Sequence, residues 1–301
     1  MTASDVMPEK IFFIINAFAG SRGNERLRER IKESLDPQRW EPVFRDTEYA
    51  GHAALLSKEA IQQGYRFIVA VGGDGTINEV AGPMIHGKST LAIIPTGSGN
   101  GLARHLKIPL TIPKAVALIN HLRYRIIDTA TMNDTKFCSL AGIGFDALVA
   151  HHFAESKRRG YFTYFSITLR HFLTFKPKKY SLIVDGEKEI ETEAFLIVFA
   201  NSNQFGYNTQ IAPKASLIDG KLDICIVKRP PWYAIPSTVK LLMTNKIDQS
   251  PYVRIIRCSQ AEVIREKDEV VNLDGEPVMM TQNLKVKNWP KSLKIIAPLH
   301  E

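Results

Sequence analysis

A glycine-rich motif that follows an apolar run constrains this chain more than any other feature. Residues 67–71 are typical of a buried β-strand, and Gly-Gly-Asp-Gly-Thr follows at residues 72–76. Glycine tolerates positive φ and close backbone approach, so the motif predicts a tight turn. Thr76 is a suitable N-cap for a helix over residues 77–85, which ends near Pro83. A strand, a turn and a helix N-terminus direct backbone N–H groups at one point, which favours an anion such as phosphate.

Asp74 lies inside this turn and limits which anion can bind there. A carboxylate repels bare phosphate, so we expect Asp74 to contact Mg²⁺ carried by the phosphates, or a reacting hydroxyl. On its own, the motif is equally compatible with an ordinary strand–helix turn whose glycines only make it tight.

Strand–helix units repeat through the first part of the chain. Strands are expected at residues 11–15, 42–45 and 91–94, and helices at residues 25–35, 51–63 and 113–122. This alternation predicts a parallel sheet with helices on both faces, in which the strand–helix loops share one edge. We therefore expect Asn16, Thr47, Asp74 and Ser98 to converge there. The loops form neither a Walker A sequence nor a well-placed GxGxxG fingerprint.

In the second part of the chain, the sequence pattern changes and short strands predominate. Residues 141–146 read as another tight turn with a carboxylate, and Asp-Gly pairs at 185, 219 and 274 read as turns. This pattern predicts an antiparallel β-sandwich. The last strand, at residues 293–297, can return to either domain.

A helix expected at residues 161–176 carries a broad stripe of aromatic and aliphatic side chains. Such a stripe is usually core, and the alternative is an acyl-chain pocket or a membrane-facing surface helped by nearby basic residues. The preceding basic run at residues 157–159 is either a solvated helix end or a group that neutralises phosphate charge.

The charge and composition of the chain limit the classes of partner that it is expected to bind. The net charge of +8 favours anionic partners. We do not expect nucleic-acid binding, because the basic residues are spread along the chain and no known motif is visible. No apolar run reaches the ~18 residues of a membrane span, and the N-terminus lacks the apolar core of a signal peptide. The three cysteines are far apart, which favours a cytoplasmic protein with reduced thiols and no zinc site.

Taken together, the motifs resemble the diacylglycerol kinase catalytic family, which includes sphingosine and ceramide kinases and bacterial lipid kinases. The matching segments are residues 16–20 (NAFAG, against NPxSG), 72–76 with Asn78 and Glu79, 95–100 (PTGSGN) with 102–104, 142–146 (GIGFD), Asp219-Gly220 and Asp274-Gly-Glu276. GGDGT alone also occurs in NAD kinases, but the ordered set is far more specific. Ala17 replaces the usual proline, which loosens the first loop.

The resemblance implies an NAD-kinase-like α/β domain at residues 1–124, to which residues 289–301 can return. It also implies a β-sandwich lipid-substrate domain at residues 125–288, and a nucleotide in the cleft between the domains. The residues that it implies for ATP are Asn16, Thr47, Gly72, Gly73, Asp74, Gly75, Thr76, Asn78, Gly97, Ser98 and Asn100, with Arg158 and Arg159 on the phosphates.

The same resemblance implies roles for the remaining motif residues. Glu276 matches the family's proton acceptor and Asp74 its catalytic-loop aspartate, and which of the two takes the proton stays open. Asp146 matches the position that contacts the substrate head group. Ser216, Asp219 and Lys221 occupy the family's Mg²⁺ loop, where backbone carbonyls contribute.

The resemblance therefore implies a kinase that uses ATP and Mg²⁺, acts on a lipid and attaches peripherally to membranes. Diacylglycerol and a sphingoid base both remain open as acceptors. A soluble NAD kinase and a non-catalytic nucleotide or lipid sensor are the alternatives. The Asp-Gly-Glu motif and the sandwich argue against the first, and the intact carboxylates argue against the second. The oligomeric state stays open, a homodimer included.

Overall fold

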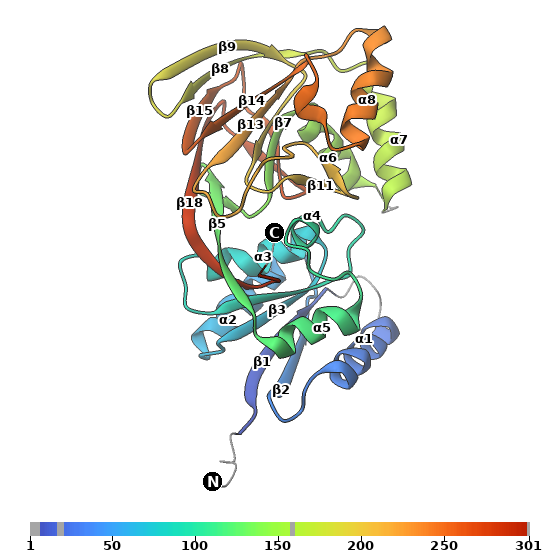
Figure 1. Cartoon of the computed structure of the whole chain (residues 1–301), viewed down its shortest axis with the longest axis vertical. Coiled ribbons are helices and arrows are strands. Elements are labelled where there is room, and N and C mark those ends of the chain that lie inside the picture. Colours follow the sequence, from blue (N-terminus) through green and yellow to red (C-terminus); the bar gives the residue numbers. More distant parts are fainter. Residues whose placement is uncertain (1–6, 17–20, 157–159, 300–301) are drawn as a thin grey trace. The chain divides into compact units, whose positions relative to one another are not determined.

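The computed structural model describes residues 7–16, 21–156 and 160–299. The chain groups into two compact units (Figure 1). The first is drawn from Met1–Gly97, Leu106–Ile126 and Ser292–Glu301, and the second from Ser98–His105 and Ile127–Lys291. Two long strands, β5 (Tyr124–Met132) and β18 (Asn283–Ile296), carry the chain from one unit to the other.

A parallel sheet forms the centre of the first unit. Its strands are β1 (Glu9–Ile15), β2 (Trp40–Asp46), β3 (Phe67–Gly72) and β4 (Thr90–Pro95), in the order β2-β1-β3-β4. The end of β18 joins the sheet in parallel beside β4, where Ile295 pairs with Leu91. Every residue of β3 and β4 is buried. Such continuous burial is typical of a parallel strand covered on both faces.

Helices cover both faces of this sheet. They are α1 (Ser21–Ser34), α2 (His52–Gln62), α3 (Asp74–Met84) and α5 (Ile112–His121). Alternate side chains of the strands, such as Phe13 and Val69, pack with α1 and α5 in one cluster. Helices α2 and α3 contact each other and the strands β1, β3 and β4. The predicted α/β architecture of the first part of the chain is confirmed.

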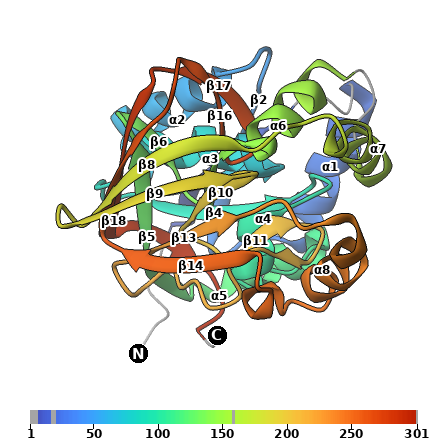
Figure 2. The same cartoon turned by 90° about the horizontal axis from the view of Figure 1, so that it is seen from above.

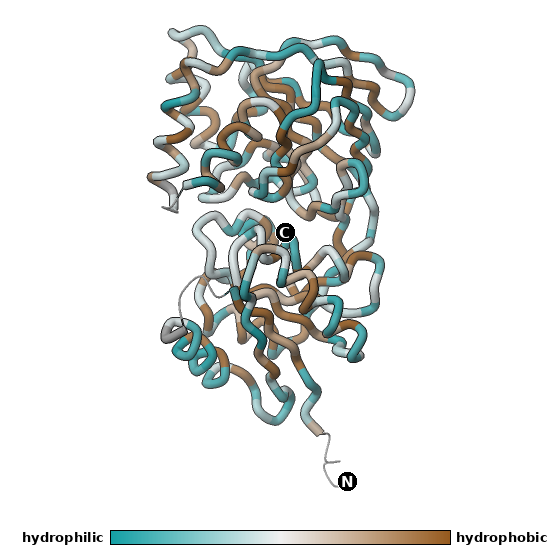
Figure 3. Tube along the Cα trace, turned by 180° about the vertical axis from the view of Figure 1, so that it is seen from behind, coloured by the Kyte–Doolittle hydropathy of each residue, from teal (hydrophilic) through white to brown (hydrophobic). Residues whose placement is uncertain are grey.

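The second unit is built from two facing antiparallel sheets. One has the order β14-β13-β10-β7-β16-β17, and the other includes β18-β15-β8-β9. The strands are β7 (Leu140–Gly144), β8 (Lys178–Val184), β9 (Lys188–Ala194), β10 (Leu196–Ala200), β13 (Leu222–Val227), β14 (Val253–Cys258), β15 (Gln260–Ile264), β16 (Glu269–Leu273) and β17 (Glu276–Met280). A single core cluster takes side chains from both sheets, including Phe199 and Leu182. This arrangement confirms the predicted sandwich, and Figure 3 shows apolar residues concentrated along the inner parts of the trace.

Shorter strands, helices and 3₁₀ turns complete the second unit. They are β6 (Thr135–Phe137), which pairs with β5, the hairpin of β11 (Gln204–Gly206) and β12 (Thr209–Gln210), the helices α4 (Gly101–His105), α6 (Phe145–Glu155), α7 (Tyr161–Phe172) and α8 (Ile235–Met243), and the 3₁₀ turns η2 (Trp232–Ala234) and η3 (Ile247–Gln249). Figures 1 and 2 both place α7 and α8 on the same side of this unit. None of the helices in the described ranges is long and apolar enough to cross a bilayer.

Two predictions about this unit are wrong in detail. Residues 141–144 continue strand β7, because Ala141 and Ile143 pack into the core and pair with β10. The turn is confined to Gly144, whose φ of +77° leads directly into α6. Helix α7 ends at Phe172 instead of residue 176, and the chain enters β8 six residues later.

Candidate functional site

The loops that follow β1, β2 and β3 meet at the carboxyl edge of the parallel sheet. Ile15 pairs with both Asp46 and Val71 across this edge. The next residues extend the same ladder, because the Asn16 N–H donates to Val71 O at 3.0 Å and the Thr47 N–H donates to Ile15 O at 2.9 Å. The structure therefore brings Asn16, Thr47 and the β3–α3 turn together. Ser98 begins a segment that is grouped with the second unit.

The glycines of the β3–α3 turn serve close packing. Gly73, the helix N-cap, has φ −94°, and Gly75 lies inside α3, so of the two properties expected of these glycines the turn uses close approach and not positive φ. A Cβ on Gly72 would lie 2.6 Å from the Cβ of Thr76, and a Cβ on Gly73 would lie 3.2 Å from the Cα of Gly97. The motif therefore lets the chain turn sharply onto its own helix and lets the loop after β4 approach it.

Thr76 lies inside α3 and connects this helix to the loop after β1. Because α3 begins at Asp74, the N-cap is Gly73, and the prediction that Thr76 caps the helix is wrong. The Thr76 hydroxyl instead accepts a hydrogen bond from Asn16 Nδ2 at 2.8 Å. This contact links the loop after β1 to the first turn of α3. The first N–H groups of a helix lack partners within it and carry the positive end of its dipole, so this turn suits an anion.

Glu79 has a structural role that the sequence did not reveal. Its carboxylate accepts hydrogen bonds from the backbone N–H groups of Gly51 and Ala53, at 3.0 and 3.2 Å. Glu79 thus supplies acceptors for the N-terminus of α2, which has no side-chain cap of its own. The pairing of α2 with α3 therefore gives this carboxylate a structural role.

In the second unit, residues 98–105 are fixed by contacts with the β10–β12 region. His105 Nδ1 lies 2.7 Å from Asn203 Oδ1. Within the segment itself, Gly99 O accepts a hydrogen bond from Arg104 Nε at 2.9 Å. A Cβ on Gly206, whose φ is +110°, would lie 3.1 Å from Gly99 Cα. Glycine at both positions lets the two backbones pack directly together.

Asp146 is a buried carboxylate at the first turn of α6. It is 4% exposed, and its Oδ2 accepts a hydrogen bond from Asn272 Nδ2 at 2.8 Å. Burial raises the pKa of Asp146 from 3.8 to about 6, and the bond from Asn272 opposes this rise. Gly142 leaves the room that this carboxylate occupies, since a Cβ there would lie 1.7 Å from Asp146 Oδ2. Asn272 was not expected to position Asp146, because nothing in the sequence pairs them.

The raised pKa makes stability depend on pH. Because the folded-state pKa lies above the unfolded value, the contribution of Asp146 to stability is full below pH 4 and is lost as pH rises through about 6. We expect Asp146→Asn to remove this loss and to gain up to about 3 kcal/mol in unfolding free energy relative to wild type at pH 7. Urea unfolding of both proteins from pH 4 to 8 measures the difference, and parallel pH profiles would contradict the prediction.

The Asp274-Gly275 turn anchors two strands. Leu273 pairs with Glu276 across it, and both central residues have positive φ, 51° and 93°, as a type I′ hairpin requires. The Asp274 carboxylate accepts hydrogen bonds from the backbone N–H groups of Cys138, Ser139 and Leu140 at 2.6 to 2.9 Å. Asp274 is thus a structural residue, and Glu276 is exposed as the first residue of β17.

The predicted Mg²⁺ loop is held by charged side chains. Asp219 Oδ1 accepts the Lys221 N–H at 3.0 Å, and Asp219 Oδ2 forms an ion pair with Arg257. Buried Asp128 also supports the loop by accepting the Gly220 N–H at 2.7 Å. Ser216 Oγ accepts only a long bond from the Ile218 N–H, at 3.4 Å. Across the described residues, no group of three or more His, Cys, Asp or Glu side chains is arranged to hold a metal ion.

Two predicted phosphate-binding residues, Arg158 and Arg159, lie outside the described residues, as do residues 17–20 of the first motif. The other predicted residues fall into two groups. Those near the β3–α3 turn belong to the first unit, and Ser98, Asn100, Asp146, the residue 216–221 loop and Glu276 belong to the second.

Two family models match the chain in succession. The diacylglycerol kinase catalytic domain matches residues 10–132, and the YegS C-terminal NAD kinase beta sandwich-like domain matches residues 139–297. A protein of Pseudomonas aeruginosa named a probable YegS-like lipid kinase is 30% identical over 280 residues, which cover 92% of this chain and 91% of that protein. A protein of Chromohalobacter salexigens with the same name is 28% identical over 265 residues, covering 85% and 84%.

Solved structures share the fold. A diacylglycerol kinase of Bacillus anthracis superposes with a TM-score of 0.73 at 20% identity, covering 97% of each chain. An NAD kinase of Archaeoglobus fulgidus, solved in complex with ATP, superposes with a TM-score of 0.53 at 14% identity, covering 95% of this chain and 93% of that one. The chain thus has an NAD-kinase-like fold with a parallel α/β unit and a β-sandwich unit. The chain belongs to the diacylglycerol kinase-like family of YegS-like lipid kinases.

Proposed function

We propose that this protein transfers the γ-phosphate of ATP to the hydroxyl of a lipid, with Mg²⁺ bound to the phosphates. The observation that carries the proposal is the carboxyl edge of the first unit. There the Asn16 side chain donates a hydrogen bond to the Thr76 hydroxyl, and the first turn of α3 faces the loops after β1 and β4. In a chain of this kinase family, such an edge fits a phosphate chain. Asp74 supplies the oxygen ligand type that Mg²⁺ prefers.

The transfer requires few covalent roles from the protein. The lipid oxygen forms a bond to the γ-phosphorus, the bond from that phosphorus to the bridging oxygen breaks, and ADP leaves. A carboxylate takes the hydroxyl proton, and we assign this role to Glu276, with Asp74 as the alternative acceptor. Most of the rate then comes from positioning and charge stabilisation. Asp146, with Asn272 bonded to it, is assigned to the lipid head group.

The first test is a substrate panel. The protein is incubated with ATP and Mg²⁺ and with mixed micelles of diacylglycerol, sphingosine or ceramide, alongside NAD and a no-lipid control. Phosphate transfer to one lipid, absent with NAD, is the expected result and names the acceptor. Transfer to NAD alone would replace the proposal with a soluble NAD kinase. ATP binding without transfer to any acceptor would favour a sensor.

We further propose that the second unit docks on anionic membranes through an α7–α8 surface. It is made of exposed side chains on and just after α7, and on η2, the turn that leads into α8: Phe162, Phe165, Leu169, Leu173, Trp232 and Tyr233. Leu173 is 71% exposed and Trp232 is 83% exposed. The Arg229 guanidinium joins the two parts of this surface, because it donates to Leu173 O at 3.0 Å and to Phe175 O at 3.1 Å. Arg170 lies on α7 and Lys240 on α8, and both cationic side chains suit an acidic lipid surface.

This surface predicts salt-sensitive, peripheral binding. Burial of an exposed leucine in lipid contributes about 1.5–3 kcal/mol, so the double variant Leu169→Ser/Leu173→Ser should bind vesicles at least about tenfold more weakly. Sedimentation with phosphatidylglycerol vesicles at low and high salt measures both effects. Leu55→Ser on α2, where the leucine is 45% exposed, is the matched control. Unchanged binding by the double variant would remove this surface from the proposal.

A further inference from the structure

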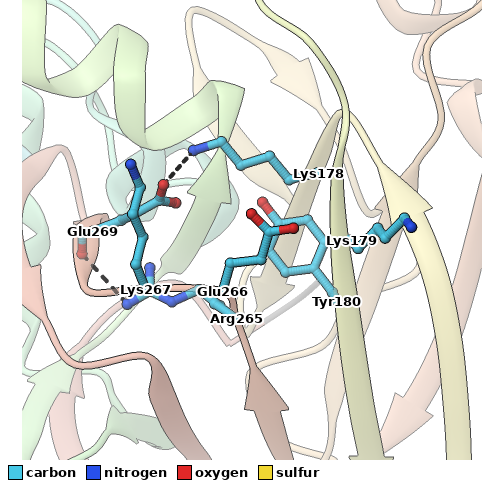
Figure 4. A pocket seen from close by; sticks show the side chains of 7 residues that line it. All are labelled: Lys178, Lys179, Tyr180, Arg265, Glu266, Lys267 and Glu269. Carbon is cyan, nitrogen blue, oxygen red and sulfur yellow. Dashed lines mark hydrogen bonds and ion pairs between the residues drawn. The ribbon is translucent and has the colours of Figure 1, made fainter.

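A cavity of about 170 Å³ lies in the second unit, apart from every residue assigned to the reaction. It is formed by the start of β8 and by the connection from β15 to β16 (Figure 4). Four cationic side chains line it, from Lys178, Lys179, Arg265 and Lys267, against the two carboxylates of Glu266 and Glu269. A single water needs only about 15 Å³ of such space, so the cavity has room for a larger ligand.

Arg265 is the unusual member of this lining. It is only 5% exposed, and its Nη2 donates to the backbone oxygens of Met280 and Thr281 at 3.0 and 2.6 Å. Its Nε and Nη1 are buried without a hydrogen-bond partner. A guanidinium can only donate, and a buried donor left unsatisfied is destabilising. The side chain is therefore fixed at one nitrogen and lacks acceptors at the other two.

The residues that surround Arg265 do not supply the hydrogen-bond acceptors that it lacks. Tyr180 is 2% exposed, and its hydroxyl has no partner. Glu269 is already paired with Lys178, whose Nζ lies 2.6 Å from Glu269 Oε1. Figure 4 shows this pair, together with the bond from Arg265 to the backbone of Glu269. Burial lowers the pKa of Arg265, whereas the charge of Glu269 raises it, so a further negative charge would favour the guanidinium.

We propose that this cavity binds a phosphate-type oxyanion. Such an anion supplies several acceptor oxygens to the two unpartnered Arg265 nitrogens and the Tyr180 hydroxyl, and it balances the excess of cationic side chains. A metal cation is the wrong ligand, because the unsatisfied groups of Arg265 only donate. The proposal does not depend on catalysis by this protein.

Two ligands can supply a phosphate-type oxyanion to this cavity: inorganic phosphate and the phosphomonoester head group of a lipid. The cavity lies close to the end of the α7–α8 surface, since Lys178 Nζ sits 5.5 Å from the centre of the Phe175 ring, two residues beyond Leu173. A lipid source is therefore tested beside the soluble one.

Lysine acetylation read by mass spectrometry gives a local measurement. Lys267 is exposed at the cavity, and Lys58, exposed on α2 in the first unit, is the reference residue. We expect millimolar phosphate to slow acetylation of Lys267 severalfold relative to chloride at equal ionic strength, and to leave Lys58 unchanged. Stronger protection by phosphatidic acid vesicles than by phosphatidylcholine vesicles would assign the lipid source, and protection by inorganic phosphate alone would assign the soluble one. Equal acetylation in phosphate, in chloride and with both vesicles would overturn the proposal.

Two variants should change the protection of Lys267 by phosphate in opposite directions. Arg265→Gln, checked for folding by circular dichroism, should abolish the protection of Lys267. Glu266→Gln removes an exposed negative charge from the lining and should lower the half-protecting phosphate concentration severalfold. Glu262→Gln on β15, where Glu262 pairs with Lys285, is the matched control and should change nothing. A folded Arg265→Gln protein that keeps the protection would overturn the proposal. If that variant does not fold, an unchanged value for Glu266→Gln would do the same.

Discussion

Glu276→Gln is expected to lower the turnover number by about 10²–10⁴-fold, the usual loss when a general base is removed. The backbone should stay in place, because the hairpin that carries Glu276 is set by the positive φ of Asp274 and Gly275 and by the bond from the Gly275 N–H to Asn272 Oδ1. Glutamine keeps the shape of the side chain but removes its negative charge and, with it, the ability to take a proton. Nucleotide affinity should therefore stay within about twofold of wild type.

Steady-state kinetics on the lipid named by the substrate panel test this assignment. Asp74→Asn gives the informative contrast, since loss of a Mg²⁺ contact in the first turn of α3 should raise the KM for ATP as well as lower turnover. Glu262→Gln, an exposed glutamate of the same unit, is the control and should behave as wild type. Normal turnover by Glu276→Gln together with a collapse in Asp74→Asn would move the proton acceptor to Asp74.

The fold was predictable because its patterns are local. Strands β1, β3 and β4 of the first unit are apolar runs followed by polar loops, and strands of this kind must be buried on both faces. The edge that gathers Asn16, Thr47 and the β3–α3 turn then follows from parallel topology alone. The sandwich followed in the same way from short strands separated by Asp-Gly turns.

The errors concern the local geometry of a turn, and the omissions concern contacts between residues that are distant in the sequence. Glycine in the β3–α3 turn can serve positive φ or close packing, and only the position of Thr76 against Gly72 decides between them. Glu79 reaches the N-terminus of α2, and Asn272 reaches Asp146 across 126 positions of sequence. Neither partner leaves a spacing pattern, because sequence separation within a sheet or between helices is not periodic.

Asp274→Ala is expected to destabilise the second unit by at least about 3 kcal/mol. The Asp274 carboxylate is buried and satisfies the N–H groups of Cys138, Ser139 and Leu140, and each buried donor left unsatisfied costs about 1–3 kcal/mol. At about 2–4 °C per kcal/mol for a unit of this size, the melting temperature should fall by at least about 6 °C. Differential scanning calorimetry of the full chain measures the change.

Two comparisons separate this network from an ordinary turn. Asp185→Ala is the matched control, because Asp185 Oδ1 also accepts two backbone N–H groups, from Ser259 and Gln260, but at an exposed position where water replaces it. Its effect should stay below about 1 kcal/mol. The Cys138 thiol gives a local readout, since it is buried and its pKa is raised by burial and by the charge of Asp274. Asp274→Ala should therefore speed its reaction with a thiol reagent, whereas equal melting temperatures and equal thiol reactivity in the two variants would mean that the carboxylate does not organise the entry to β7.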